Sequence, residues 1–369
     1  MPRSAIGLLG GILVIVGGIA AAAQVKPSAL RAVPAETTAA KAKDPSWSPP
    51  RTAWGHPDLE GIWTSDDMRG IPTARPASQA DRESLTPEEF ARRAGGDETF
   101  RDRAVNQETF LRNEFGVRTF GYTSFIVDPR DGHMPVLTER GLGRSKARGG
   151  VGTFGTRPFN GFDDFSLYDR CITRGVGGIF PVLYGNGLLI AQTPDEVVIS
   201  YEMVHDTRVI PLDGRPHVPR AITEYMGDAR GHWEGDTLVV ETTNFTGTVD
   251  FFGVPHSDQA TLTERFTRIY PQMIDYGLRL DDPINLSAPV TFRLTITQQP
   301  NYQLYEYSCH EGNSAVGNAL SGERAYEKAV ANAIAKGLPI PTRAPIGMEV
   351  YTGGAVEGRE PVREFGFGK

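Results

Sequence analysis

The feature of this sequence that most constrains its fold is a series of short β-prone runs that begin about every ten residues after residue 186. The runs cover residues 187–193, 196–203, 208–211, 229–234, 236–244, 261–270, 272–280, 289–297 and 302–309. Short strands at this spacing are typical of antiparallel barrels and sandwiches. The 42 glycines and 27 prolines among the 369 residues supply turns between them. We therefore predict a mainly β fold, an antiparallel barrel or sandwich with a few peripheral helices and long irregular arms.

Two pairs of runs have the form of β-hairpins. Pro194-Asp195 separates the runs 187–193 and 196–203, and Gly235-Asp236 separates the two β-prone halves of 232–243. Short turns of this composition between alternating runs predict antiparallel neighbours.

The changes in composition along the chain predict four parts. These are a signal peptide at 1–23, an N-terminal arm with one helix at 24–119, an antiparallel β domain at 120–313, and a C-terminal helix with a wrapping tail at 314–369.

Two helices are predicted. Thr86-Pro87-Glu88-Glu89 has the form of a capping box with proline at the first helical position, which predicts a helix over about 87–105, interrupted near Gly95-Gly96. The spacing of alanine and other apolar residues in 318–336 predicts an amphipathic helix that packs on the sheet.

The N-terminus has the pattern of an export signal. Arg3 precedes an uncharged apolar run that ends in the small residues Ala21 and Ala23, as in a secretory signal peptide with an A-x-A cleavage site. The alternative is an uncleaved membrane anchor, because the run approaches the roughly 20 residues that span a bilayer. No second run of that length follows. We expect an exported protein, periplasmic or secreted, without stable membrane insertion after cleavage.

The sequence holds two cysteines, Cys171 and Cys309. In an oxidising compartment, two cysteines most simply form one disulfide. Two alternatives stay open: two buried free thiols, or a metal site that uses Cys309 with His310 but lacks the CxxC pairs of specific zinc sites.

Charge and motifs exclude several functions. The net charge is −7 and no Lys/Arg cluster occurs, which argues against a nucleic-acid partner. Glycine-rich phosphate loops, H-E-x-x-H and G-x-S-x-G are absent in the required contexts. We therefore predict no cofactor, and a divalent metal stays open.

Three segments carry a resemblance. They are Tyr201–His217 (YEMVHDTRVIPLDGRPH), Gly231–Phe245 (GHWEGDTLVVETTNF) and Tyr305–Asn313 (YEYSCHEGN). They resemble a large family of exported bacterial proteins without an assigned activity, over roughly residues 50–330. The second segment is also similar, more weakly, to strands of lipocalin-like (calycin) barrels. The resemblance implies no catalytic residues, so the site is argued from chemistry alone.

The first candidate cluster is His205-Asp206-Thr207-Arg208, at the end of a predicted strand. A histidine titrates near neutral pH, and a neighbouring carboxylate can orient its ring. Arg208 can then hold an anionic oxygen. The competing interpretation is a surface turn in which Asp206 pairs with Arg208.

The second cluster is His310-Glu311, directly after Cys309. A disulfide would fix this pair near Arg174, which we predict to bind substrate. The competing interpretation is that His310 only hydrogen-bonds a loop carbonyl.

The third cluster is His232-x-Glu234, whose side chains share one strand face. With His205 or His310 it would complete a metal site, but a solvated face is the favoured interpretation, and no metal ligands are predicted. Tyr201 and Tyr305 are predicted to bind substrate, and Tyr184 and Tyr307 are further aromatic candidates.

Two functional hypotheses remain. The first is an exported β-barrel enzyme, a lyase, isomerase or hydrolase, that transfers protons on a small lipophilic or aromatic molecule without a cofactor. His205 or His310 is its base, with Asp206 or Glu311 beside it, and Arg208 or a tyrosine stabilises negative charge. The second is a non-catalytic, lipocalin-like carrier of such a molecule. A less favoured third is a cell-envelope scaffold that grips partners with its proline-rich arms.

Overall fold

The computed structural model describes residues 47–79, 82–106, 116–147, 158–182, 184–248, 250–251, 254–299 and 302–342. The predicted signal peptide, the rest of the arm before residue 47 and the tail after residue 342 lie outside the described residues.

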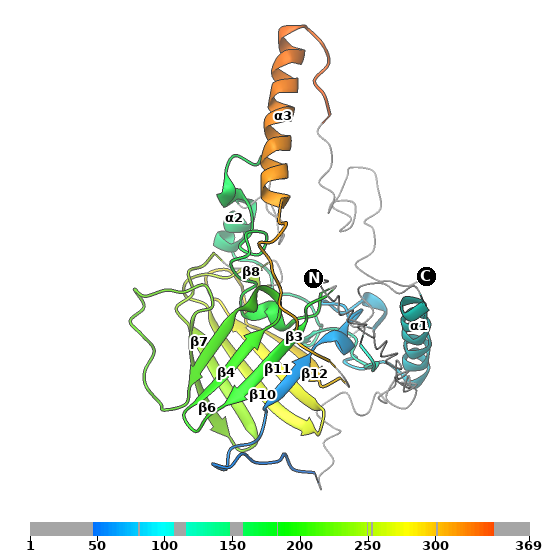
Figure 1. Cartoon of the computed structure of the whole chain (residues 1–369), viewed down its shortest axis with the longest axis vertical. Coiled ribbons are helices and arrows are strands. Elements are labelled where there is room, and N and C mark those ends of the chain that lie inside the picture. The colour runs from blue at the N-terminus through cyan, green and yellow to red at the C-terminus, as the bar shows by residue number, and fades with distance from the viewer. Residues whose placement is uncertain are drawn as a thin grey trace, which may run out of the picture.

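The core of the protein is a nearly closed antiparallel barrel (Figure 1). Its strands are β1 (Gly61–Thr64), β3 (Gly187–Gln192), β4 (Glu196–Tyr201), β5 (Thr207–Pro211), β6 (Asp228–Glu234), β7 (Thr237–Thr243), β10 (Thr261–Tyr270), β11 (Met273–Asp281) and β12 (Val290–Thr297). They are ordered β5-β4-β3-β1-β12-β11-β10-β7-β6, and β2 (Ile126–Asp128) also pairs with β12. A separate pair joins β8 (Asp250–Phe251) to β9 (Val254–Pro255). The predicted mainly β fold with antiparallel strands and peripheral helices is thus confirmed, in its barrel form.

Helical segments surround the barrel. The α-helices are α1 (Pro87–Asn106), α2 (Glu139–Ala147) and α3 (Ala315–Ala335), and the short 3-10 helices are η2 (Asp66–Met68), η3 (Ala77–Gln79), η5 (Phe162–Asp164), η6 (Val176–Ile179) and η7 (Met203–His205). Within the described residues, no helix is long and apolar enough to cross a membrane.

The two end strands of the sheet, β5 and β6, close the barrel through side chains. In the described part of the chain they have no backbone ladder between them. Gly231 of β6 instead lies so close to Ile210 and Leu212 that a Cβ there would approach their methyl groups to 2.9 and 2.8 Å. The missing side chain at Gly231 therefore allows the seam to close.

Alternation along the strands fills the barrel interior. Every second residue of β10 is buried, from Leu262 to Arg268, and β11 and β12 supply further buried residues such as Tyr276 and Phe292. Large side chains from several strands meet in one apolar cluster. The interior of this small barrel is packed. The sequence hypothesis expected a pocket enclosed by the barrel, whereas the pocket described below opens at the end of β4.

The capping box of α1 forms as predicted. The Thr86 amide donates to Glu89 at 2.8 Å, and the Glu89 amide donates to the Thr86 hydroxyl at 3.3 Å. The helix is continuous through Gly95-Gly96, so the predicted interruption there is wrong. The intrinsic cost of about 1 kcal/mol per glycine weakens this helix without breaking it.

Two predicted boundaries need correction. β1 lies within the predicted N-terminal arm, yet it pairs with β3 and β12 inside the barrel. Conversely, residues 302–309 form no strand. β12 already pairs with β11 on one side and with β1 and β2 on the other, so this segment finds no free edge beside β12. It crosses the end of the barrel as an irregular segment, which we call the strap.

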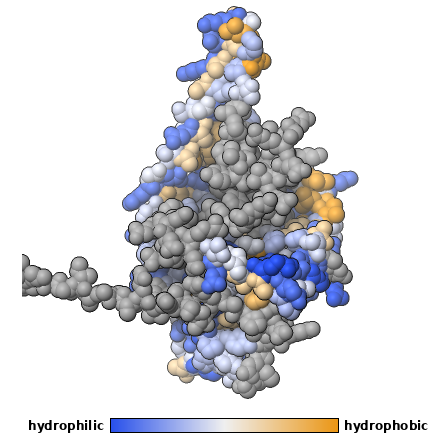
Figure 2. Space-filling model, turned by 90° about the vertical axis from the view of Figure 1, so that its right-hand side faces the viewer, coloured by the Kyte–Doolittle hydropathy of each residue, from blue (hydrophilic) through white to orange (hydrophobic). Residues whose placement is uncertain are grey.

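α3 does not pack on the sheet as predicted, but projects away from the barrel (Figure 1). Only Glu323 and Ala333 of this helix are buried. Apolar residues gather at its tip (Figure 2), where Ile334, Leu338 and Ile340 are exposed.

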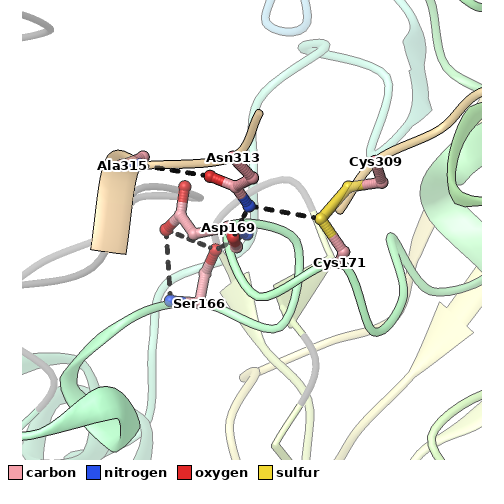
Figure 3. The surroundings of a disulfide bond; sticks show 6 residues. All are labelled: Ser166, Asp169, Cys171, Cys309, Asn313 and Ala315. Carbon is pink, nitrogen blue, oxygen red and sulfur yellow. Dashed lines mark hydrogen bonds between the residues drawn. A yellow bond between two sulfur atoms is a disulfide. The ribbon is translucent and has the colours of Figure 1, made fainter. Parts of the chain in front are cut away.

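The disulfide between Cys171 and Cys309 joins the strap to the loop before η6, as predicted (Figure 3). The two residues are 138 apart in sequence, and their Cα atoms lie 5.7 Å apart. Asn313, just before α3, donates to the Asp169 carbonyl at 3.0 Å and to Cys171 Sγ at 3.3 Å. Disulfides are typical of oxidising, extracytosolic compartments.

Removing the disulfide should destabilise the protein. We expect the Cys171→Ala/Cys309→Ala variant to lose about 2–5 kcal/mol of unfolding free energy, because the unfolded chain regains the entropy of a long open loop. Denaturant unfolding of the variant and of the oxidised and reduced native chain measures this. Equal midpoints for all three forms would contradict a stabilising bridge.

Candidate functional site

A pocket of about 270 Å³ opens where the end of β4, the turn after it and the strap meet. We call it the strap pocket. Its lining residues are Ser200, Tyr201, Glu202, His205, Leu304, Tyr305, Glu306 and Tyr307. A histidine, a carboxylate and several tyrosines thus converge on one cavity, the arrangement that favours a catalytic over a purely apolar binding site.

The turn between β4 and β5 holds His205 at this pocket. Val204 and His205 both have left-handed backbone, with φ of 65° and 45°. The Tyr201 amide closes the turn by donating to the Asp206 carbonyl at 2.8 Å. A β-branched residue in this conformation is unusual and strained. The turn buries Val204 and exposes His205.

The sequence hypothesis proposed that Asp206 orients the His205 ring, but the Asp206 carboxylate has other partners. This carboxylate accepts from the Thr173 hydroxyl at 2.6 Å and from the Arg174 amide at 3.3 Å. Burial raises the pKa of Asp206, against the lowering effect of these hydrogen bonds and of the nearby His205 charge. Asp206 therefore ties the turn to the loop that carries Cys171, and it does not pair with Arg208 on the surface either.

Glu202 anchors the strap over the pocket. Its buried carboxylate accepts from the Tyr302 hydroxyl at 2.6 Å and from the Tyr305 amide at 3.4 Å. A Cβ at Gly187 would collide with this carboxylate and with the Tyr302 ring. Glycine at that position therefore makes room for the strap.

Tyr307 of the strap forms a cluster with Tyr168 and Tyr184. The three phenols lie close enough to affect one another's pKa, and the rings of Tyr184 and Tyr307 stack with centroids 6.2 Å apart. Burial is the main cause that raises the pKa of each. The three phenols are therefore neutral hydrogen-bond donors at neutral pH.

Arg174, a predicted binding residue, lies beside this cluster and is not among the residues that line the pocket. Its guanidinium is 5.8 Å from the centroid of the Tyr168 ring and donates to the Phe180 carbonyl at 3.3 Å. Burial lowers the pKa of Arg174, while Tyr168, Tyr307 and other neighbours oppose that change.

Arg208 faces the barrel interior, and this corrects its predicted catalytic role. Its guanidinium makes two hydrogen bonds to Glu264, at 3.0 and 2.6 Å, and donates to Thr242 at 3.1 Å. Tyr276 donates to the same carboxylate at 2.9 Å. Burial lowers the pKa of Arg208, but the charge of Glu264, the nearby Tyr201 and the hydrogen bonds to both together outweigh it and raise the pKa. The charge of Arg208 is thus already neutralised, and it has none to offer a ligand.

Tyr201 connects the interior to the pocket. It lines the strap pocket, and its hydroxyl accepts from Arg208 at 3.4 Å. Burial raises the pKa of Tyr201 to about 12, and the charge of Arg208 opposes that rise. This predicted binding residue is thus a rigid, neutral part of the pocket wall.

The remaining predicted residues divide between pocket and surface. Tyr305 lines the pocket and is 55% exposed. His310 and Glu311 lie in an exposed turn after the disulfide, outside the lining residues. The disulfide does bring this turn close to the Cys171 loop, but His310 and Glu311 do not join His205.

The His232 and Glu234 pair forms a solvated surface contact. The two side chains are exposed, 3.2 Å apart, and Glu234 also pairs with Arg265 at 2.7 Å. Across the described residues, no group of three or more His, Cys, Asp or Glu side chains is placed to hold a metal ion.

Sequence reasoning missed Glu202, Tyr168 and Glu264. Glu264 had a usable signal, because it stands between Leu262 and Phe266 at a position that alternation assigns to the barrel interior. Glu202 and Tyr168 lie in irregular segments, where no period indicates side-chain direction.

Asp169 stabilises the loop before the disulfide (Figure 3). Its carboxylate accepts from the Ser166 hydroxyl at 2.8 Å and from the Ser166 amide at 3.2 Å. Burial nevertheless raises the pKa of Asp169 from 3.8 to about 6.

Comparisons of the chain with protein-family models, with curated proteins and with solved structures found no match.

The effects of substituting Arg208 and Glu264 on the free energy of unfolding should be strongly coupled. Arg208→Met or Glu264→Leu alone leaves a buried charge unpaired, and each should cost about 3–5 kcal/mol of unfolding free energy. The double variant should cost clearly less than the two single costs added together. Denaturant unfolding of all four proteins measures this cycle, and additive costs would contradict a mutually neutralising pair.

Asp169 should make stability depend on pH. The pKa of Asp169 is higher in the folded protein, about 6, than its ordinary value of 3.8. The buried charge therefore lowers the folding stability fully above pH 6, and this destabilisation disappears as the pH falls toward 3.8. Asp169→Asn should therefore stabilise the protein at pH 7, by on the order of 1 kcal/mol given its partial exposure, and the gain should shrink at pH 4.5. Asp163→Asn, in the same loop but exposed, is the control. A gain that does not vary with pH would contradict this role.

Proposed function

We propose that this protein is an exported β-barrel enzyme that binds a small aromatic or lipophilic molecule in the strap pocket and transfers a proton on it without a cofactor. The observation that carries the proposal is the convergence of His205, Glu202 and Tyr307 on one cavity. The chemistry matches a proton-transfer lyase or isomerase more closely than a hydrolase, since the site presents a base and neutral phenols but no nucleophile activated by a neighbouring base.

The step needs a base and donors for the developing charge. His205 is exposed and lines the pocket, and an imidazole is the side chain that most often serves as a general base. It removes a proton from a carbon next to a carbonyl group. The C–H electron pair forms a carbon–carbon double bond with the carbonyl carbon, the C=O π pair moves onto the oxygen, and a pocket tyrosine donates a hydrogen bond to that oxyanion. In a β,γ-unsaturated ketone, return of the proton from His205 to the γ-carbon of the dienolate shifts the double bond and gives an isomer.

Export to the periplasm or beyond is part of the proposal. The Cys171–Cys309 disulfide supports it, because such bridges persist outside the cytosol. The apolar segment before Gln24, with its small-residue cleavage site, is the proposed signal peptide.

A second candidate function is non-catalytic binding of the same class of molecule. One observation favours it: within the described residues, no carboxylate forms a hydrogen bond with the His205 ring to orient it, since Asp206 binds Thr173 instead. A carrier needs the pocket and its aromatic walls but not an oriented base.

Deuterium exchange separates the two functions without knowledge of the product. The mature chain is incubated in D₂O with a panel of aryl ketones and aryl-substituted β-keto acids, and mass spectrometry follows deuterium uptake at carbon. We expect uptake in at least one compound, and we expect His205→Ala to reduce its rate by about 10²-fold or more.

His310→Ala is the matched control, because it removes a histidine that lies outside the pocket. It should keep the exchange rate, and both variants should keep the native melting temperature. Equal rates for the two variants would contradict His205 as the base. Saturable binding without exchange would favour the carrier, and stoichiometric metal in the active protein would contradict the cofactor-free mechanism.

A further inference from the structure

Arg174 differs from the other buried or half-buried arginines in what surrounds its charge. Arg208, Arg118 and Arg293 pair with carboxylates at 2.6, 3.0 and 2.7 Å. Arg75 and Arg93 each donate to two backbone carbonyls.

Arg174 has neither arrangement. Among the described residues, its guanidinium donates to the Phe180 carbonyl alone. Among the residues that the structure describes, no carboxylate oxygen lies within the 4.0 Å of an ion pair. The carboxylate of Asp206 binds the Arg174 backbone amide instead.

The groups around this guanidinium are suited to an anion. Tyr168, Tyr307 and Tyr201 lie near Arg174, and a charged group near it is Asp206, whose carboxylate binds the Arg174 backbone amide. All three tyrosines are neutral phenols. A hydroxyl can rotate about its C–O bond, so the neighbouring hydroxyls of Tyr168, Tyr184 and Tyr307 can turn toward an acceptor. A half-buried guanidinium surrounded by neutral hydroxyl donors can form strong, charge-assisted hydrogen bonds with a ligand oxyanion.

The cluster adjoins the strap pocket. Tyr201 and Tyr307 line the pocket and are also neighbours of Arg174. A Cβ at Gly178 would lie 3.5 Å from the Arg174 Cβ and 3.7 Å from the Tyr201 ring, so the arginine stem runs beside the pocket wall. Two carboxylates also line the pocket: Glu202, whose oxygens already accept from Tyr302 and Tyr305, and Glu306, which is exposed to solvent.

We infer that Arg174, with the hydroxyls of Tyr168, Tyr184 and Tyr307, binds the anionic oxygen of the ligand, and that the ligand is an aromatic carboxylate whose ring lies in the strap pocket. This inference rests on the proposed binding role of the pocket and names its ligand class. It does not require that the pocket be catalytic.

Two probes of equal shape and different charge test it. Benzoate and benzamide are titrated into the native protein by calorimetry, each in the same low-salt buffer. We expect benzoate to bind at least about tenfold more tightly than benzamide, because a charge-assisted hydrogen bond is stronger than a neutral one. Equal affinities, or no binding of either probe, would overturn the anion site.

Charge-matched variants locate the site. Arg174→Gln should weaken benzoate binding about tenfold or more and leave benzamide binding within about twofold. Arg170→Gln is the control, because Arg170 lies four residues away, pairs with Asp163 at 3.6 Å and sits over the Phe162 ring. It removes the same charge and should leave benzoate binding within about twofold. Equal effects of the two substitutions would overturn the assignment to Arg174.

Folding is checked by melting temperature and near-ultraviolet circular dichroism. If Arg174→Gln unfolds, Tyr307→Phe takes its place, since it keeps the ring and removes one donor. It should weaken benzoate binding about three- to tenfold with little effect on benzamide, and an unchanged preference for benzoate would overturn the tyrosine contribution.

These results are separable from those on catalysis. Arg174-dependent benzoate binding without deuterium exchange would uphold the anion site and contradict the proposed enzyme. Exchange that is lost in His205→Ala but unaffected in Arg174→Gln would uphold the enzyme and overturn the anion site.

Discussion

The barrel depends on the buried interaction between Arg208 and Glu264. β5 is an end strand of the sheet, and in the described chain it meets β6 without a backbone ladder. Arg208 of β5 reaches across the interior to Glu264 of β10 and to Thr242 of β7. These bonds draw the open edge of the sheet toward strands on the far side of the seam. Burying this ion pair costs the solvation free energy of both charged groups. Its hydrogen bonds are directional, however, whereas apolar contacts are not.

The pocket depends on different constraints, because two of its walls are irregular. The strap has no strand ladder, and the Cys171 loop has only short helical turns. The disulfide, Glu202 and Asp206 replace the missing ladder by tying the strap and the loop to each other and to the end of β4. The position of Arg174 is thus determined by chain crosslinks rather than by the barrel itself. Function concentrated on loops that a rigid scaffold positions is a common arrangement.

Most of the barrel could be predicted from the sequence, and much of the site could not. β12 alternates apolar and polar residues along its length, and β11 does so along most of it, so periodicity located these strands. The turn at Gly235-Asp236 was recognisable from its residue types. The run 302–309 has similar β propensity, yet its backbone is bound by a side chain, Glu202, and by a crosslink. Propensity describes a segment's preference and not whether a strand edge is free to receive it. The disulfide was predictable because an expected export signal left two cysteines few other roles. The inward direction of Arg208 and the grouping of three tyrosines around Arg174 arise from long-range contacts that a linear pattern does not contain.

β1 has a consequence for how this chain reaches its folded state. It lies outside the loop that the disulfide closes, yet it is inserted between β3 and β12, both of which lie inside that loop. During synthesis the four residues of β1 emerge early, and one of their two partners is the last strand of the barrel to appear. The sheet therefore cannot be completed progressively from one end, and its final gap is filled by a segment from near the chain's start. Pairing over such a distance is slow to form. Proteolysis that removes residues beyond 60 would therefore delete β1, a strand of the barrel.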